Sequence, residues 1–95
     1  MQVRMTTVYR DWIDGLGDLA ARARIQVRVD RLAHGNPGSH RRLREGVSEL
    51  KVDVGPGYRV YYTKRDSTLI VLLVGGDKST QRQDIELAIK LARDL

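Results

Sequence analysis

Basic side chains gather in the second half of the chain, on segments whose patterns predict strands. Lys51 lies on the polar side of an alternating segment, and Arg59 follows the turn Gly55-Pro56-Gly57 that leads into the next one. If neighbouring strands pair in chain order, the side chains of Lys51 and Arg59 converge on one exposed face of the sheet. Lys78 follows the next apolar segment. These three cations are candidates for binding a phosphate group.

An aromatic ring and three more cations extend this group. Tyr61 shares the face of Arg59, and the segment before the hairpin, which we expect either to pair with the hairpin or to cover it, carries Arg41, Arg42 and Arg44. RNA recognition requires both features, since cations bind the phosphates and rings stack on unpaired bases. Each cation taken alone is better explained as a solvated strand residue. Their grouping with a ring favours an open RNA-binding face.

A second set of cations lies on the helix expected at residues 18–33. Arg24, Arg28 and Arg31 recur at helical spacing, on a different face from the apolar stripe of the same helix. Such a row is most often a solvated helix face. The sharper interpretation is a docking surface for an acidic protein partner or for ribosomal RNA.

The sequence excludes several familiar kinds of active site. The chain has no cysteine, so neither a disulfide nor a thiolate metal site can form. It has no HExxH or GxSxG motif and no pair of carboxylates spaced for glycoside or metal chemistry. The segment 75–80 joins a strand to a helix, but Asp77 stands where a phosphate-binding loop needs a glycine before its lysine. We therefore expect no metal and no cofactor.

Periodicity predicts the elements that must position these residues. The N-terminal residues predict a strand, and apolar residues at helical spacing then predict two helices, capped by Thr6 or Thr7 and by Asp18. Three strands follow, two of them in a hairpin, and a last helix begins where Thr80 and Gln83 have capping-box spacing. The order β-α-α-β-β-β-α predicts an α+β fold with a mostly antiparallel sheet and the helices packed on one face.

Length and charge bound the kind of protein. The 95 residues make one small domain, residues 1–95, with no internal repeat and no dividing linker. The net charge of +5 and the pI of about 10.0 favour polyanionic partners. No apolar stretch is long enough for a signal peptide, and the longest apolar run, residues 69–74, is far short of a membrane span. We therefore expect a cytoplasmic protein with no membrane partner.

Five segments spread over nearly the whole chain are shared with a known family. The most specific are Gly-Pro-Gly-Tyr-Arg-Val-Tyr-Tyr at residues 55–62 and Gly-Gly-Asp-Lys-Ser-Thr-Gln at residues 75–81. The others are Thr-Val-Tyr-Arg-Asp-Trp-Ile at residues 7–13, Ala-Arg-Ala-Arg-Ile at residues 21–25 and Gly-Val-Ser-Glu-Leu-Lys at residues 46–51. The chain thereby resembles the HigB-like "addiction module killer" branch of the RelE/ParE toxin superfamily, and its expected element order agrees with the RelE-like fold.

The resemblance implies the toxin of a type II toxin–antitoxin system. Toxins of this kind enter the ribosomal A site and cleave the bound mRNA, so that an mRNA interferase of this class is a ribosome-dependent endoribonuclease that inhibits translation. The implied partners are the ribosome, its message and a cognate antitoxin, commonly a HigA-like helix-turn-helix protein. Operator DNA would be contacted only through that antitoxin.

The resemblance also implies catalytic roles for individual residues. The 2′-hydroxyl attacks the adjacent phosphate, and fixed cations stabilise the phosphorane that develops. Arg59 matches the arginine in the family's Tyr-Arg-Val strand and is assigned to the scissile phosphate. Lys51 matches a basic position on the preceding strand, where it could orient the substrate or act as a base. Lys78 corresponds approximately to the basic position after the last strand.

One departure from the family pattern leaves other functions open. Several relatives place a tyrosine or histidine near the start of the last helix or at the C-terminus, as a general acid or a stacking group. This chain has Gln81, Gln83 and Asp84 near the start of that helix, and no general acid is identified. The alternatives are a ParE-like inhibitor of DNA gyrase and a non-catalytic protein that acts only through its antitoxin complex.

Overall fold

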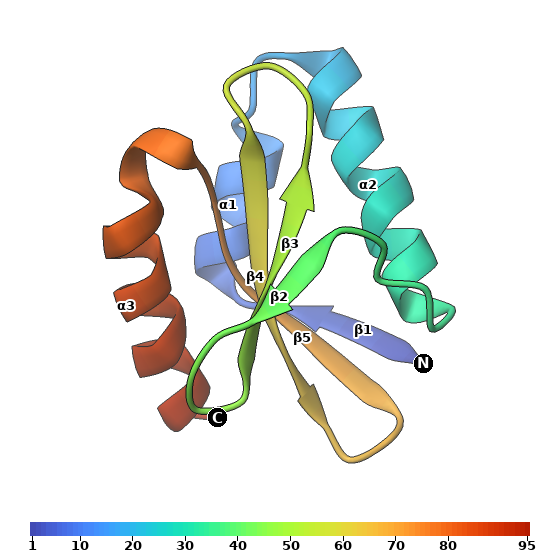
Figure 1. Ribbon diagram of the computed structural model, residues 1–95, viewed down its shortest axis with the longest axis vertical. Coiled ribbons are helices and arrows are strands. Elements are labelled where there is room, and N and C mark those ends of the chain that lie inside the picture. The colour runs from blue at the N-terminus through green and yellow to red at the C-terminus, as the bar shows by residue number, and fades with distance from the viewer.

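The computed structural model describes all residues, 1–95, and combines strands and helices as the sequence predicts (Figure 1). Its elements are β1 (Gln2–Met5), α1 (Thr7–Asp14), α2 (Leu19–Ala33), β2 (His40–Arg42), β3 (Val47–Val52), β4 (Tyr58–Arg65), β5 (Leu69–Asp77), the one-turn 3₁₀ helix η1 (Lys78–Thr80) and α3 (Gln81–Arg93). The α+β class and the order of the main elements are confirmed. The segment before the hairpin adds the short strand β2, so it pairs with the hairpin.

The strands form one sheet in the order β1-β5-β4-β3-β2. β1 runs parallel to β5, and the other three pairs are antiparallel, as expected of a mostly antiparallel sheet. In β5, residues 70–76 are all buried. This explains the continuous apolar run in the sequence, because a strand inside the sheet that is covered on both faces has no polar side.

The helices pack on both faces of the sheet, which corrects the expectation that they share one face (Figure 1). On one face, α1 and α2 bury side chains such as Ile25 against Leu50 of β3 and Val60 of β4. On the other face, α3 buries Ile89 against Leu73 of β5. The physical reason is the apolar character of β5 on both sides, which requires a second cover.

Two of the three predicted helix starts are confirmed by side-chain caps. Thr6 Oγ1 accepts from the backbone N–H of Tyr9 at 3.1 Å, and Asp18 Oδ1 accepts from that of Ala21 at 3.0 Å. At α3 the expected capping box is replaced. The 3₁₀ turn η1 precedes the helix, and Thr80 makes no side-chain cap but donates to Asp84 Oδ2 at 2.6 Å.

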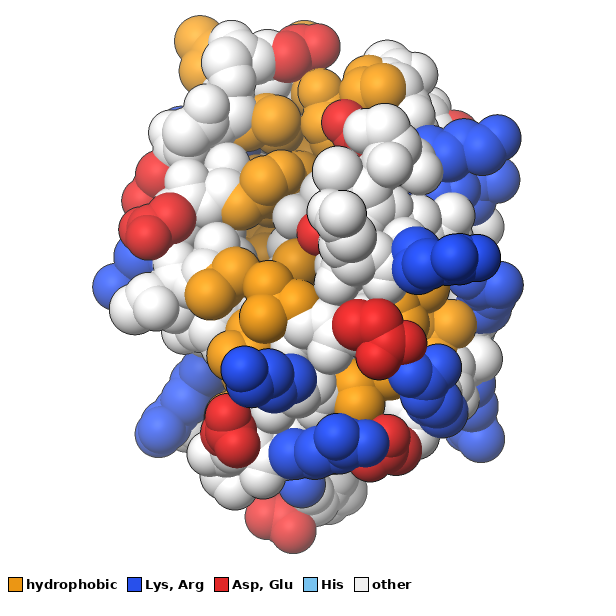
Figure 2. Space-filling view, turned by 90° about the vertical axis from the view of Figure 1, so that its left-hand side faces the viewer, with side chains coloured by type: hydrophobic (Ala, Val, Ile, Leu, Met, Phe, Trp, Pro, Cys, Tyr) orange, Lys and Arg blue, Asp and Glu red, His pale blue; other side chains and the backbone are white.

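Apolar side chains form an exposed strip on the face of the molecule shown in Figure 2. Met5 and Val8, from β1 and α1, are 39% and 37% exposed, and Leu87 of α3 is 37% exposed. Met5 also lines a hollow of about 410 Å³, together with Val71 and Leu95 among others. None of the helices has the length and apolar character that crossing a membrane requires.

Candidate functional site

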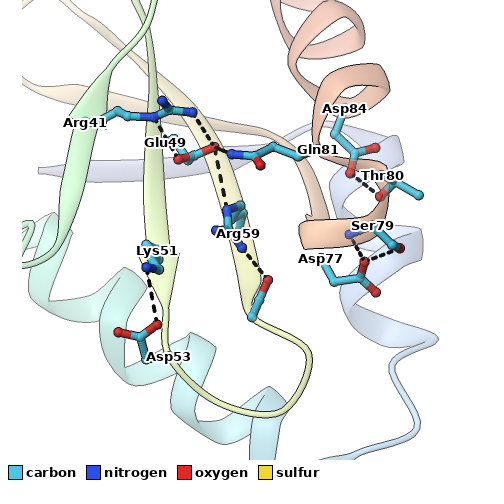
Figure 3. A network of polar contacts seen from close by, with 11 residues as sticks. Arg41, Glu49, Lys51, Asp53, Arg59, Asp77, Ser79, Thr80, Gln81 and Asp84 are labelled. Carbon is cyan, nitrogen blue, oxygen red and sulfur yellow. Dashed lines mark hydrogen bonds and ion pairs between the residues drawn. The ribbon is translucent and has the colours of Figure 1, made fainter.

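Lys51 and Arg59 lie side by side on the sheet (Figure 3). β3 and β4 pair with Lys51 opposite Arg59, and β4 and β5 pair with Arg59 opposite Gly76. The three positions form a row across neighbouring strands. The row lies on the face that α3 covers, because Arg59 and Tyr61 point to the same side of the sheet and Tyr61 packs against α3. The expectation that Lys51 and Arg59 share one face is confirmed, but the expectation that this face is exposed is wrong at Arg59. The Lys51 side chain is 46% exposed, whereas that of Arg59 is 8% exposed.

Lys78 reaches the same end of the sheet from the turn after β5. It begins η1 and is exposed. The turn before β4 lies between Lys78 and Arg59: a Cβ built on Gly57 would be 4.0 Å from the Cβ of Lys78 and 3.2 Å from Nη1 of Arg59. Gly57 has φ +81°, a conformation that favours glycine. The three cations considered for phosphate binding therefore gather around one turn.

Arg59 is held by its own strand and by a carboxylate. Its Nη1 donates to the carbonyl oxygen of Gly57 at 2.6 Å, and its Nε lies 3.8 Å from Oε2 of Glu49. The buried Nε has no hydrogen-bond partner. The guanidinium is thus fixed in position before any anion arrives, which suits a cation that must stabilise developing negative charge.

Glu49 is a central residue that the sequence reasoning missed (Figure 3). Its Oε1 accepts from Arg41 Nε at 3.1 Å and its Oε2 from Gln81 Nε2 at 2.9 Å, and the residue is 5% exposed. Burial alone raises the pKa of Glu49, but the hydrogen bonds from Gln81 and Arg41 outweigh burial and hold that pKa below its usual value. Glu49 is therefore a buried carboxylate that positions two arginines. In the sequence, only the alternating pattern that Glu49 shares with Lys51 indicates which face of the sheet Glu49 lies on.

Tyr61 does not have the role that the sequence suggested. Its side chain is 0% exposed and packs with Leu73 and Ile89 under α3. Burial and the neighbouring charge of Glu49 raise the pKa of its hydroxyl. The expectation that Tyr61 stacks on RNA bases is wrong, because α3 covers the part of the sheet that was expected to be open.

The three arginines before the hairpin point in different directions. Arg41 lies opposite Glu49 and Arg42 opposite Ser48 in the β2–β3 pair, so consecutive side chains fall on opposite faces. Arg44, beyond β2, forms an ion pair with Glu86 of α3, and the side chains of Arg41 and Arg44 are 57% and 60% exposed. Arg41 and Arg44 therefore share the α3 side with the row, and Arg42 does not.

Arg28 serves the fold, which corrects its assignment to a docking surface with Arg24 and Arg31. Its guanidinium donates to the carbonyl oxygens of Lys51, Pro37 and Ser39, the last two at 2.9 and 3.0 Å. These bonds tie α2 to β3 and to the loop before β2. Arg24 and Arg31 remain exposed on α2.

Two carboxylates lie at the start of α3, beside the row (Figure 3). Asp77 accepts from the backbone N–H of Ser79 at 2.8 Å and from its hydroxyl, and these bonds lower the pKa of Asp77. Asp84 is half-buried; burial is the main cause that raises its pKa, Asp77 adds to the effect and the Thr80 hydroxyl opposes it. No group of three or more metal-ligating side chains is present. The site thus combines cations with one carboxyl that binds protons more tightly than usual.

Comparisons with known proteins cover the whole site. Residues 11–94 match the family described as "Phage derived protein Gp49-like (DUF891)". An "Uncharacterized protein" of Haemophilus influenzae is 42% identical over 95 residues, which span 100% of this chain and 96% of that protein. The family match includes β3, β4, β5 and α3, which together supply the row and its neighbours. The chain is therefore a member of the phage-derived Gp49-like family.

Proposed function

We propose that this protein is the toxin of a type II toxin–antitoxin pair, a RelE/HigB-like endoribonuclease that cleaves mRNA on the ribosome in the cytoplasm. The observation that carries the proposal is the gathering of Lys51, Arg59 and Lys78 around one turn, although they come from β3, β4 and the end of β5. The net charge of +5 supports it, because a basic surface is attracted to a ribosome and its message.

The chemistry needs what these cations supply. When a 2′-hydroxyl attacks the adjacent phosphate, the phosphorane carries more negative charge than the ground state. Cations that are already in place stabilise this charge without reorganising at the moment of reaction. Arg59 is the most firmly held of the three, and we assign it to the scissile phosphate. Lys51 and Lys78, which are exposed, approach the flanking phosphate oxygens.

Further RNA contacts are assigned to the exposed arginines on the same side. Arg41 and Arg44 lie toward β2 and α3, where they can bind phosphates upstream or downstream of the cleaved bond. The pair of Arg44 with Glu86 is exposed on both sides and is weak enough to exchange for a phosphate, whereas Arg41 keeps its bond to the buried Glu49 and offers only the N–H groups that Glu49 does not use.

The test is cleavage of message on translating ribosomes by the purified protein, with RNA 5′ ends mapped by sequencing. We expect new ends within coding sequence only when ribosomes are present. Lys51→Ala and Lys78→Ala, at exposed positions, should each slow cleavage on the order of 10²-fold. Lys64→Ala is the matched control, because it removes the same charge from an exposed position of β4 outside the row. Normal translation at saturating protein, or equal losses in all three variants, would contradict the proposal.

The same variants separate this function from inhibition of DNA gyrase. A protein that poisons gyrase by binding alone does not need Lys51 and Lys78 for chemistry. Growth arrest that survives Lys51→Ala combined with Lys78→Ala, together with gyrase inhibition in a supercoiling assay, would therefore favour the ParE-like alternative. Growth arrest on expression of the chain by itself would exclude a protein that acts only through a partner complex.

The cognate antitoxin is proposed to be an acidic protein with a helix-turn-helix domain, and operator DNA is bound through it. The exposed Arg24 and Arg31 on α2 are the proposed contacts, since Arg28 is committed to the fold. Co-expression with the product of the adjacent gene should give a stable complex and restore growth. Arg24→Glu with Arg31→Glu should weaken that complex; an unchanged affinity would move the interface elsewhere.

A further inference from the structure

The side chain of Asp84 lies where the row has none of its own, at Gly76. Gly76 stands opposite Arg59 in the β4–β5 pair, and a Cβ built on Gly76 would lie only 2.0 Å from Oδ2 of Asp84. The carboxylate of Asp84 therefore fills the space that a side chain at position 76 would take. Glycine at this position is what allows α3 to bring its first turn down onto the sheet.

The row accordingly brings together three functional groups, two from adjacent strands and one from α3 that lies over the third strand. Cross-strand neighbours have Cβ atoms about 5 Å apart. Lys51 lies one strand from Arg59 on one side, and the carboxylate over Gly76 lies one strand from Arg59 on the other. A phosphate bound by Arg59 would thus have an ammonium group and a carboxylate on opposite sides. In-line transfer needs this arrangement, because the attacking and leaving oxygens lie on opposite sides of the phosphorus.

We propose, on the basis of the function proposed above, that Asp84 is the general base of RNA cleavage and Lys51 its general acid. The carboxylate of Asp84 takes the proton of the 2′-hydroxyl as the 2′-oxygen bonds to phosphorus. The bond from phosphorus to the 5′-oxygen breaks, and the ammonium of Lys51 gives that oxygen a proton. The products are a 2′,3′-cyclic phosphate and a 5′-hydroxyl. Asp84 then loses its proton to solvent and Lys51 regains one.

The surroundings of Asp84 suit a base. The Thr80 hydroxyl donates to Oδ2 at 2.6 Å and fixes the carboxylate, while no protein donor is bonded to Oδ1. The charged and titratable groups around it are Asp77 at the end of β5, Tyr61 of β4 and Arg59 beside Gly76. Burial and Asp77 raise the pKa of Asp84, which makes the ionised carboxylate a stronger proton acceptor than an exposed aspartate.

The experiment is single-turnover cleavage of ribosome-bound message across an acidic to neutral pH range. Asp84→Asn keeps the shape of the side chain and should lower the cleavage rate about 10²–10⁴-fold without weakening ribosome binding. In the wild-type protein the rate should rise with pH through the pKa of Asp84, since the base must be ionised. This rise should be missing from the residual activity of Asp84→Asn.

Two neighbouring variants should move the pH profile in opposite directions, which a structural role would not do. Thr80→Val removes the hydrogen bond that lowers the pKa of Asp84, so the rise should shift to higher pH. Asp77→Asn removes the charge that raises this pKa, so the rise should shift to lower pH. If the wild-type protein and Asp84→Asn cleave equally fast, this inference alone is overturned. The same holds if neither Thr80→Val nor Asp77→Asn shifts the pH profile of cleavage. A wild-type protein that never cleaves would overturn the proposed function as well.

Discussion

At the scale of single residues, Glu49 joins parts of the molecule that are distant in sequence. It accepts from Arg41 of β2 and from Gln81 of α3, and its Oε2 lies 3.8 Å from Arg59 Nε. A buried ion pair is weak evidence for stability in itself, but removing one partner leaves a buried charge without compensation. Glu49 therefore helps to position Arg59 and also compensates its buried charge.

Glu49→Gln should destabilise the protein by about 3–5 kcal/mol in urea unfolding, because the buried guanidinium of Arg59 loses its counter-charge. The control is Asp53→Asn at an exposed ion pair with Lys51, whose loss should cost less than about 1 kcal/mol. The pKa of Glu49 is lowered on folding, so its contribution is present above the usual glutamate pKa of 4.5 and is lost as pH falls through the lower, folded-state pKa. The variant should lack this acid-dependent loss; equal acid sensitivity in both proteins would refute the assignment.

Gly76→Ala tests the close approach of α3 to the sheet. The added Cβ would meet Asp84 Oδ2 at 2.0 Å, so the carboxylate must move. We expect a folded protein destabilised by roughly 1–3 kcal/mol, with its cleavage rate lowered toward that of Asp84→Asn. A Cβ at Gly17 meets nothing within 4 Å, so Gly17→Ala should leave both quantities nearly unchanged. Full activity in Gly76→Ala would show that the position of Asp84 is not critical.

At the scale of elements, local patterns predicted the strands and helices, but not what covers each face. Alternation placed Lys51 and Arg59 on one side, and the register confirms this. The same alternation made Tyr61 look accessible. Its burial depends on α3, and the apolar stripe of α3 does not by itself tell which face of the sheet the helix covers. Glu49 was missed for the same reason, since its partner Gln81 lies 32 residues away.

Arg28→Ala should show that this side chain fastens α2 to the sheet. The guanidinium donates to three backbone carbonyls, from residues 37, 39 and 51. Its loss should destabilise the protein by about 1–3 kcal/mol, because these carbonyls lose a charged donor. Arg24→Ala, on the exposed part of the same helix, should change stability by less than about 0.5 kcal/mol. Equal thermal midpoints for the two variants would contradict a fastening role.

At the scale of the whole molecule, the excess of 17 Lys and Arg over 12 Asp and Glu directs the protein toward a polyanion. Binding to ribosomes should weaken steeply as salt rises, since each phosphate contact releases condensed counterions. Binding measured at several salt concentrations should show a shallower dependence for Lys51→Ala and Lys78→Ala than for Lys64→Ala. Salt-independent binding would indicate an apolar contact instead, for which the strip in Figure 2 is the available surface.

The pairing of β1 with β5 joins segments that are synthesised at different times and, on the proposed function, affects when the protein becomes active. Thr6 donates to the carbonyl of Leu73, 67 residues later, and α3 follows β5. Because synthesis proceeds from the N-terminus, the first strand waits without its partner while the rest is made. Gly76 and Asp84 can reach Arg59 only after β5 and the start of α3 have been synthesised. On the proposed function, the chain therefore cannot cleave the message of the ribosome that is making it until these segments have been synthesised.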